Sequence, residues 1–187
     1  MVRTVYTIGH SSHDLTTFFS LLKRFHIDTI VDIRRSPRST RFPHFNSEYL
    51  SSSSFNYLFR GDILGGRRQR RKSLEHLNDG LVDDDDLHAY ADHMQRIEFQ
   101  QCVNECITFS SQSLVLMCAE NHPSQCHRTL LADYLVLVHQ IDVIHILGSG
   151  ETFQHQLNPI ARFNESKRIC YYPSSTNNQQ LVGKDNL

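Results

Sequence analysis

The sequence has few residues that break regular structure, and it has no long apolar run. Only eight glycines and five prolines occur among its 187 residues, which excludes a collagen-like chain. Apolar residues make up 39% and charged residues 21%, which excludes a coiled coil and a wholly disordered chain. The longest apolar stretch, 130–138, is interrupted by Asp133, so no segment reaches the length of a membrane span. We therefore expect a globular protein without a membrane partner.

The chain also lacks the signs of a secreted protein. Its first residues, MVRTVYTIGH, have no apolar signal-peptide core and run directly into an expected strand. The five cysteines are an odd number and contain no CxxC pair, which argues against a disulfide framework. We therefore expect an intracellular protein, cytoplasmic or nuclear.

A net charge close to zero conceals a strongly basic segment. Between Arg34 and Lys72 the chain carries ten lysines and arginines and only two acids, a local charge of +8. Cations bind phosphates and aromatic rings stack on unpaired bases, so an interleaved pattern favours nucleic acid as the partner. The alternative is a solvated arginine loop whose aromatic residues pack into the core. The aromatic residues interleaved with the basic ones are Phe42, His44, Phe45, Phe55, Tyr57 and Phe59.

Apolar runs and helical periodicities alternate along the chain, which predicts an α/β domain with a mainly parallel sheet. This domain is expected to have three layers, with helices flanking the central sheet, and to cover residues 1–150. A C-terminal extension at 151–173 and a disordered tail at 174–187 follow it. Strands are predicted at 5–8, 29–33, 113–118 and 142–146. Helices are predicted at 15–25, from Asp83 towards Phe109, and at 125–138 with Ser124 as the N-cap.

A long insertion is expected after the second strand, at about residues 35–80. It contains serines, arginines and aromatic residues without a helical or strand period, and its basic run follows Gly66. A segment of this length without secondary structure is usually functional or disordered. We expect it to extend over the carboxyl ends of the strands.

Polar residues gather at the points where three predicted strands end. His10 and Ser11 follow the first strand, Asp32 and Arg34 end the second, and the segment from Cys118 follows the third. In open parallel sheets, ligands bind outside the carboxyl ends of the strands. The sequence therefore predicts a site there, where His10 can exchange protons and Asp32 can orient arginines or act as a base.

The segment from Cys118 to Arg128 carries the densest chemistry. If Cys126, His127 and Arg128 lie in the first turn of a helix, the helix N-terminus and Arg128 can share an anion. The same surroundings make a thiol more acidic. Four interpretations of Cys118 and Cys126 stay open: packing residues, a nucleophilic or redox thiol, metal ligands, and a disulfide. Cys102, Cys106 and Cys170 are interpreted as packing residues.

These residues also carry a family resemblance. The segments TIGHS at 7–11, VDIR at 31–34, LGG at 64–66, MCAE at 117–120 and CHR at 126–128 resemble the domain of unknown function 488 family. The similarity spans about residues 4–147, and it implies the same α/β fold without implying an activity. The arginine run after Gly66 and the polar tail after Cys170 depart from the family pattern. The positions that match the pattern are His10, Asp32, Arg34, Gly65, Gly66, Cys118, Glu120, Cys126, His127 and Arg128.

The functional hypothesis is an enzyme that cleaves a nucleic acid or a nucleotide by hydrolysis or at a glycosidic bond. A non-catalytic nucleic-acid-binding module is the first alternative, and a thiol-based enzyme or redox sensor for a small oxyanion is the second. No cofactor is expected, with a divalent metal on Cys118 and Cys126 as the weaker alternative. The candidate catalytic residues are His10, Asp32, Glu120, Cys118, Cys126 and His127. The candidates for binding phosphate or nucleic acid are Ser11, Arg34, Arg38, Gly65, Gly66, Arg67, Arg68, Arg70, Arg71 and Arg128.

Overall fold

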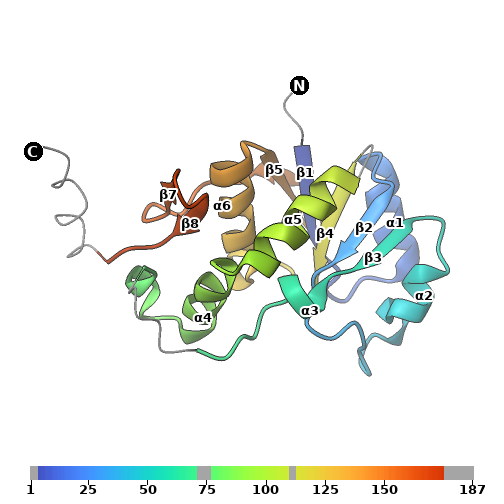
Figure 1. The fold of residues 1–187 in the computed structure, drawn as a ribbon. Helices are drawn as coiled ribbons and strands as arrows, with labels where there is room; N and C mark the ends of the chain where they lie inside the picture. Colours follow the sequence, from blue (N-terminus) through green and yellow to red (C-terminus); the bar gives the residue numbers. More distant parts are fainter. Residues whose placement is uncertain (1–3, 71–76, 110–112, 175–187) are drawn as a thin grey trace, which may run out of the picture.

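The computed structural model describes residues 4–70, 77–109 and 113–174, and its centre is a six-stranded sheet (Figure 1). The strand order is β3-β2-β4-β1-β5-β6; the first five strands are parallel and β6 is antiparallel to β5. The predicted mainly parallel α/β fold is therefore confirmed. The strands are β1 Thr4–Gly9, β2 Thr29–Asp32, β3 Asn56–Phe59, β4 Leu114–Cys118, β5 Asp142–Ile146 and β6 Thr152–Gln154.

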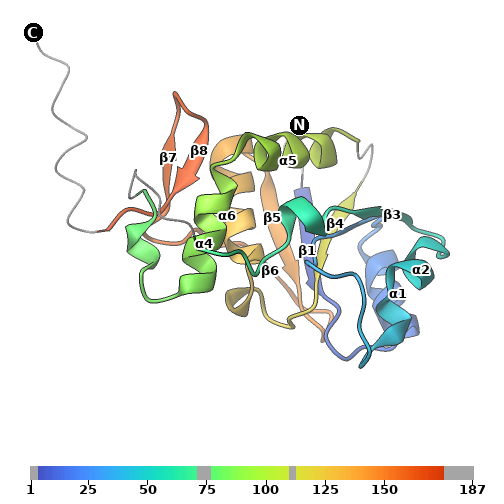
Figure 2. The ribbon, with the colours of Figure 1, turned by 60° about the horizontal axis from the view of Figure 1, so that its bottom comes forward.

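Helices cover both faces of the sheet, because its central strands are apolar on both sides. All residues of β2 and β4 are buried, as expected for parallel strands between two helical layers. Helices α1 and α2 lie on one face, and α5 and α6 on the other (Figures 1 and 2). The helices are α1 Leu15–Arg24, α2 Ser47–Ser51, α3 Gly61–Leu64, α4 Asp85–Met94, α5 Ile97–Phe109 and α6 Arg128–His139, with short 3-10 helices η1 Pro43–Phe45, η2 Asp79–Leu81 and η3 Pro123–Gln125.

The last part of the described chain forms a separate antiparallel pair, β7 Arg162–Asn164 and β8 Ile169–Tyr171. The buried Cys170 and Tyr172 join the core cluster beside α6 (Figure 1). The predicted disordered tail lies outside the described residues, apart from its first position. No helix in the described part of the chain is both long and apolar enough to cross a membrane.

Two local predictions were wrong. The insertion at 35–80 is not irregular throughout, because Asn56–Phe59 forms the edge strand β3 beside β2. The third long helix does not begin after Ser124: α6 begins at Arg128 with His127 as its N-cap, and the short helix η3 precedes it. Cys126 separates the two helices in an extended conformation, with φ −148° and ψ 145°.

Candidate functional site

A large cleft opens where β1, β2 and β4 end, at the side of the sheet that Figure 2 brings forward. Its volume is about 1030 Å³. The segments after all three strands line it, together with residues after α3 and the first residues of α4. The polar clusters predicted to meet at the strand ends therefore do meet. The predicted site residues that line the cleft are His10, Ser11, Arg34, Arg38, Gly66, Arg67, Cys118, Glu120, Cys126 and His127.

Asp32 holds Arg34 in a fixed position at the end of β2. The Asp32 carboxylate is fully buried and accepts Nε–H and Nη2–H of Arg34 at 2.9 and 2.6 Å. Its second oxygen also accepts the Tyr57 hydroxyl at 2.7 Å. Burial opposes the charge on Arg34, but its bonds to Asp32 outweigh this effect and raise the pKa of Arg34. Asp32 itself does not line the cleft, so it acts here through Arg34.

His10 is a neutral imidazole with both ring nitrogens engaged. Burial, with a contribution from the charge of Arg34, lowers the pKa of His10 to about 4. Nδ1 lies 3.0 Å from the Ser11 carbonyl oxygen and must donate to it, so Nε2 accepts from Arg34 Nη1 at 3.3 Å. The ring also stacks on Phe45, with 4.3 Å between the ring centres. These contacts fix the ring and its tautomer at neutral pH.

The two cysteines of the cleft differ in acidity. The Cys118 thiol donates to Glu120 Oε2 at 3.0 Å, and its interaction with Cys126, together with burial, raises its pKa well above the ordinary value. The interaction with Cys118 lowers the pKa of Cys126, and the charge of Arg128 lowers it further, against the effect of burial. Cys126 Sγ also accepts the backbone N–H of Arg128 at 3.5 Å, at the start of α6. Cys126 is therefore the more acidic thiol of the pair.

Glu120 stays ionised beside this pair. Burial disfavours its charge, but the thiol of Cys118, the Glu120 backbone and the charges of His127 and Arg128 together lower the pKa of the carboxyl group. A carboxylate and an acidic thiol therefore lie close together in the cleft. A half-buried negative charge needs a compensating cation.

Arg128 supplies part of this compensation from behind the cleft. Only 1% of the residue is exposed, and it does not line the cleft. Its Nη2 donates to the carbonyl oxygens of Glu120 and Asn121 at 2.7 and 3.3 Å, which fixes the segment after β4. Among the described residues, its Nε and Nη1 have no hydrogen-bond partner. In this arrangement Arg128 supports the segment after β4 through its backbone contacts and its charge.

The arginines of the basic insertion fall into two groups. Arg35, Arg38, Arg41 and Arg67 are exposed and line the cleft, in addition to the buried Arg34. The second group makes its contacts elsewhere: Arg68 donates to the carbonyl oxygens of Gly65, Asp62 and Ile63, and Arg70 pairs with Asp85. Arg71 and Lys72 lie outside the described residues. Gly65, also predicted to bind phosphate, is buried and does not line the cleft.

Most of the interleaved aromatic residues support the fold. Phe45 and Phe55 are buried in the core, and the Tyr57 hydroxyl binds Asp32. His44 contacts the backbone carbonyl of His13 at 2.8 Å. Among the aromatic residues of the insertion, Phe42 lines the cleft, and the Arg41 guanidinium lies 5.2 Å from its ring centre.

Two features of the site were not predicted from the sequence. Tyr57 lies 25 positions after Asp32, yet β3 brings its hydroxyl onto the Asp32 carboxylate. Asp84 and Asp86, at the start of α4, line the cleft together with the arginines. The acidic run at 83–86 was interpreted as a helix start, with metal binding as the weaker alternative, and not as part of the cleft.

The donor atoms of Cys118, Cys126 and His127 can hold a metal ion. All three lie within 4.8 Å of one another, and His127 Nδ1 is 3.5 Å from Cys126 Sγ. All five cysteines are free, so neither thiol is consumed by a disulfide. The metal alternative therefore gains a ligand, His127, that the spacing of the cysteines did not indicate.

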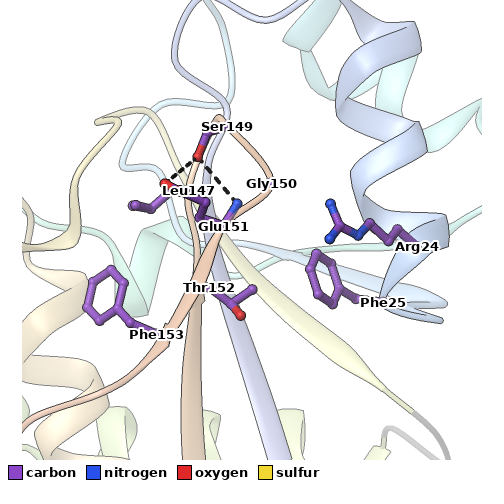
Figure 3. Close-up of a pocket in the computed structure, with 8 residues that line it drawn as sticks. All are labelled: Arg24, Phe25, Leu147, Ser149, Gly150, Glu151, Thr152 and Phe153. Atoms are coloured by element: carbon purple, nitrogen blue, oxygen red, sulfur yellow. Dashed lines mark hydrogen bonds between the residues drawn. The ribbon is translucent and has the colours of Figure 1, made fainter.

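A second concavity, of about 520 Å³, lies between the end of α1 and the turn that joins β5 to β6 (Figure 3). Arg24, Phe25 and Phe153 line it, and Ser149 bonds Glu151 beside them (Figure 3). It contains no thiol, no histidine and none of the predicted site residues. The cleft at the strand ends is therefore the better candidate for a reaction.

One comparison with known proteins gives a match. The model of the family described as "Domain of unknown function DUF488" matches residues 14–135. This range includes the cleft residues from Arg34 to His127, but not His10, Ser11 and Ser12. No curated protein and no solved structure matches the chain.

Proposed function

The chain belongs to the family described as domain of unknown function DUF488, and we propose that it is an enzyme that hydrolyses a nucleic acid or a nucleotide in the cleft. One observation carries the proposal. Exposed arginines and the acidic thiol of Cys126 line the same cleft, at the carboxyl ends of parallel strands. The arginines are suited to holding a phosphate, and Cys126 is suited to reacting with a bond next to that phosphate.

The arginines favour an anionic substrate. Of the described residues, five arginines and three acids line the cleft. Arg38 and Arg41 are exposed and make no short ion pair, the nearest being Arg38 with Glu48 at 3.9 Å. A guanidinium binds a phosphate through two parallel N–H bonds, which makes such arginines natural phosphate ligands. Arg34, whose orientation Asp32 fixes, has one N–H left to donate into the cleft.

The shape of the cleft and one aromatic residue favour a nucleotide unit. A volume of about 1030 Å³ is at the upper end of ordinary ligand pockets, roughly 300–1,000 Å³. It therefore has room for a phosphate and an attached sugar and base. Phe42 offers a ring on which a base can stack, at about 1–3 kcal/mol per stacked base.

The chemistry of the proposal needs a nucleophile and a path for protons. Cys126 provides a thiol of lowered pKa whose deprotonated form either attacks the substrate or binds a metal ion that activates water. His10 is neutral at physiological pH, so it has the protonation state of a general base. Hydrolysis fits better than thiol redox chemistry, because Cys118 donates to Glu120 and remains protonated.

Binding of fluorescent single- and double-stranded oligonucleotides, measured between about 50 and 300 mM salt, tests the substrate class. We expect affinity to fall steeply with salt, with about 0.7–0.9 units of log K lost per unit of log salt for each phosphate contact. The variant R38A/R41A/R67A is expected to bind more weakly and with a shallower slope. R162A, which removes an exposed arginine from β7, is the matched control and is expected to bind like the wild type. Negligible binding at low salt would overturn the proposal.

Analysis of the same oligonucleotides after incubation tests for catalysis. We expect shortened or base-free products from the wild type, no turnover from C126S, and unchanged oligonucleotide affinity in C126S. Full binding without any altered product would indicate a binding module. Full turnover by C126S would remove Cys126 from the mechanism.

A further inference from the structure

We propose that Cys118, Cys126 and His127 bind one zinc ion whose fourth coordination position is open to the cleft. The three residues do not form a short metal-binding motif of the CxxC type. The end of β4 supplies Cys118, and the residues directly before α6 supply Cys126 and His127. The parallel sheet therefore brings the three ligands together from two rigid elements.

The distances between the donor atoms fit one tetrahedral ion. Zinc–sulfur bonds of about 2.3 Å and zinc–nitrogen bonds of about 2.05 Å place S and N ligands about 3.6 Å apart, and two S ligands about 3.8 Å apart. The observed distance between Cys126 Sγ and His127 Nδ1 is 3.5 Å. All donor atoms of the three residues lie within 4.8 Å of one another. An ion therefore needs movements of about 1 Å or less to complete the geometry.

The donor set is the one that zinc prefers. Two sulfurs and an imidazole are soft or borderline ligands, which select zinc over magnesium or calcium. A divalent ion also balances the charge of two cysteine thiolates, so the site becomes neutral when both sulfurs bind. In the part of the chain that the structure describes, no fourth residue joins this group. Three protein ligands and one open position are the pattern of catalytic zinc sites, whereas structural sites have four ligands.

The His127 imidazole is placed for this role and is not used for another. Nδ1 lies 3.5 Å from the Cys126 sulfur, and the buried Nε2 has no hydrogen-bond partner among the described residues. The ring is held by packing, with its centre 4.9 Å from that of Tyr90. His10 is the opposite case, because both of its ring nitrogens are engaged. His127 is therefore the histidine of the cleft that is available to a metal.

The open position faces the proposed substrate site, since all three ligands line the cleft with the arginines. The catalytic role of this open position rests on the proposed function. A zinc-bound water loses a proton near neutral pH and supplies hydroxide. The hydroxide oxygen forms the new bond, the bond to the leaving group breaks, and the leaving group takes up the proton that the water lost.

Titration of the reduced, chelator-treated full chain with Co²⁺ and Zn²⁺ tests the metal site directly. We expect one Co²⁺ per chain, with the thiolate charge-transfer band and the strong visible bands of tetrahedral cobalt, and displacement by Zn²⁺. C118S, C126S and H127N are each expected to weaken zinc binding by more than about 100-fold, since even residues that only support a ligand contribute 10–100-fold. C102A removes a buried cysteine of α5 outside the group and is expected to bind zinc like the wild type. Circular dichroism verifies that each variant is folded.

Two results would overturn the proposal: a folded, reduced chain that binds no stoichiometric metal, or metal binding that survives in C126S and H127N. Full oligonucleotide turnover by the metal-free chain would also overturn the open-site interpretation. Oligonucleotide binding is measured separately, and the arginines determine it. If the chain binds oligonucleotides but no metal, the zinc site alone is rejected. If it binds the metal but no oligonucleotide, the proposed substrate is rejected and the zinc site stands.

Discussion

At Gly66 the missing side chain leaves room for the imidazole of His127. A Cβ built on Gly66 would lie 2.7 Å from His127 Nδ1 and 3.0 Å from Cγ, closer than real Cβ contacts. The neighbour is a side chain that can turn, so an added methyl would move the ring. Gly9 differs, because its Cβ would lie 1.8 Å from the Glu120 carbonyl oxygen, which belongs to the backbone.

G66A is therefore expected to weaken zinc binding by about 10-fold or more, the effect of losing a residue that positions a ligand. Its free energy of unfolding is expected to fall by no more than about 1–3 kcal/mol, the usual cost of overpacking. Zinc titration and urea unfolding of the same variant measure both quantities. G9A, where backbone has to move, should lose more stability than G66A. A folded G66A with wild-type zinc affinity would contradict this account of His127.

The Tyr57 hydroxyl is one of four protein groups that donate hydrogen bonds to the Asp32 carboxylate, along with Arg34 N, Nε and Nη2. Y57F removes this hydroxyl and keeps the ring. A hydrogen bond to a charged group contributes about 1.5–3 kcal/mol, so we expect a loss of that size in urea unfolding. Y49F is the matched control, because Tyr49 is 56% exposed, and should change stability by less than about 0.5 kcal/mol. Equal stability of the two variants would mean that Tyr57 does not support Asp32.

At the scale of elements, a buried polar chain ties the segment after β6 to the sheet and α6. Asp133 of α6 is fully buried and accepts from His155 Nε2 at 2.9 Å, from the Asn158 backbone at 3.0 Å and from the Tyr172 hydroxyl at 2.9 Å. His155 Nδ1 continues the chain to His145 Nε2 at 2.9 Å. Since Asp133 only accepts, His155 Nε2 carries a proton and donates it to Asp133.

D133N keeps the shape of the side chain but removes its charge and makes one of its atoms a donor. Leaving buried hydrogen-bonding groups unsatisfied costs about 1–3 kcal/mol each, and more beside a charged group, and we expect a loss of at least that order in urea unfolding. Backbone amides near Asn158 should also lose protection in hydrogen exchange. D142N, on the partly exposed start of β5, is the control and should stay within about 0.5 kcal/mol. A small loss in D133N would show that the chain of bonds adds little to the docking of this segment.

The elements that could be predicted from sequence are those whose own residues show the pattern of a buried strand or helix. The strand expected at 142–146 matches β5, because an apolar run between polar residues identifies a buried parallel strand. The edge strand β3 could not be predicted, since Asn56–Phe59 follows a run of serines and shows no period of its own. Its strand conformation depends on pairing with β2.

The start of α6 was misplaced for a reason that concerns the site. Ser124 has the chemistry of an N-cap, but the extended backbone of Cys126 interrupts the helix before Arg128. This interruption allows Cys126 Sγ to accept the Arg128 N–H and to lie near Cys118. The residues of the site were therefore found from strand ends, whereas the place of His127 in the proposed zinc site needed the three-dimensional arrangement.

At the scale of the whole molecule, the fold buries neutral histidines, which makes its stability sensitive to acid. Burial, together with the nearby charges of His155 and Arg128, lowers the pKa of His145 to about 3; burial and the charge of Arg34 lower that of His10 to about 4. Their exposed fractions are 2% and 3%. In the unfolded chain a histidine has a pKa of about 6.5. Between pH 6.5 and about 4, the unfolded state therefore binds protons that the folded state does not bind.

Stability is consequently expected to fall as the pH falls through this window. Each of the two histidines contributes a slope of about 1.4 kcal/mol per pH unit near pH 5, because each unfolding event takes up one proton per histidine. Urea unfolding at intervals from pH 7 to pH 4.5 measures the slope. H145N should reduce it by the contribution of one histidine even though the variant is less stable at every pH. H26N replaces a histidine at an exposed position and leaves both buried histidines in place, so its slope is expected to stay close to that of the wild type. If H145N and the wild type have the same slope, His145 is already protonated in the folded protein, and a neutral His145 between Thr7 and His155 is wrong.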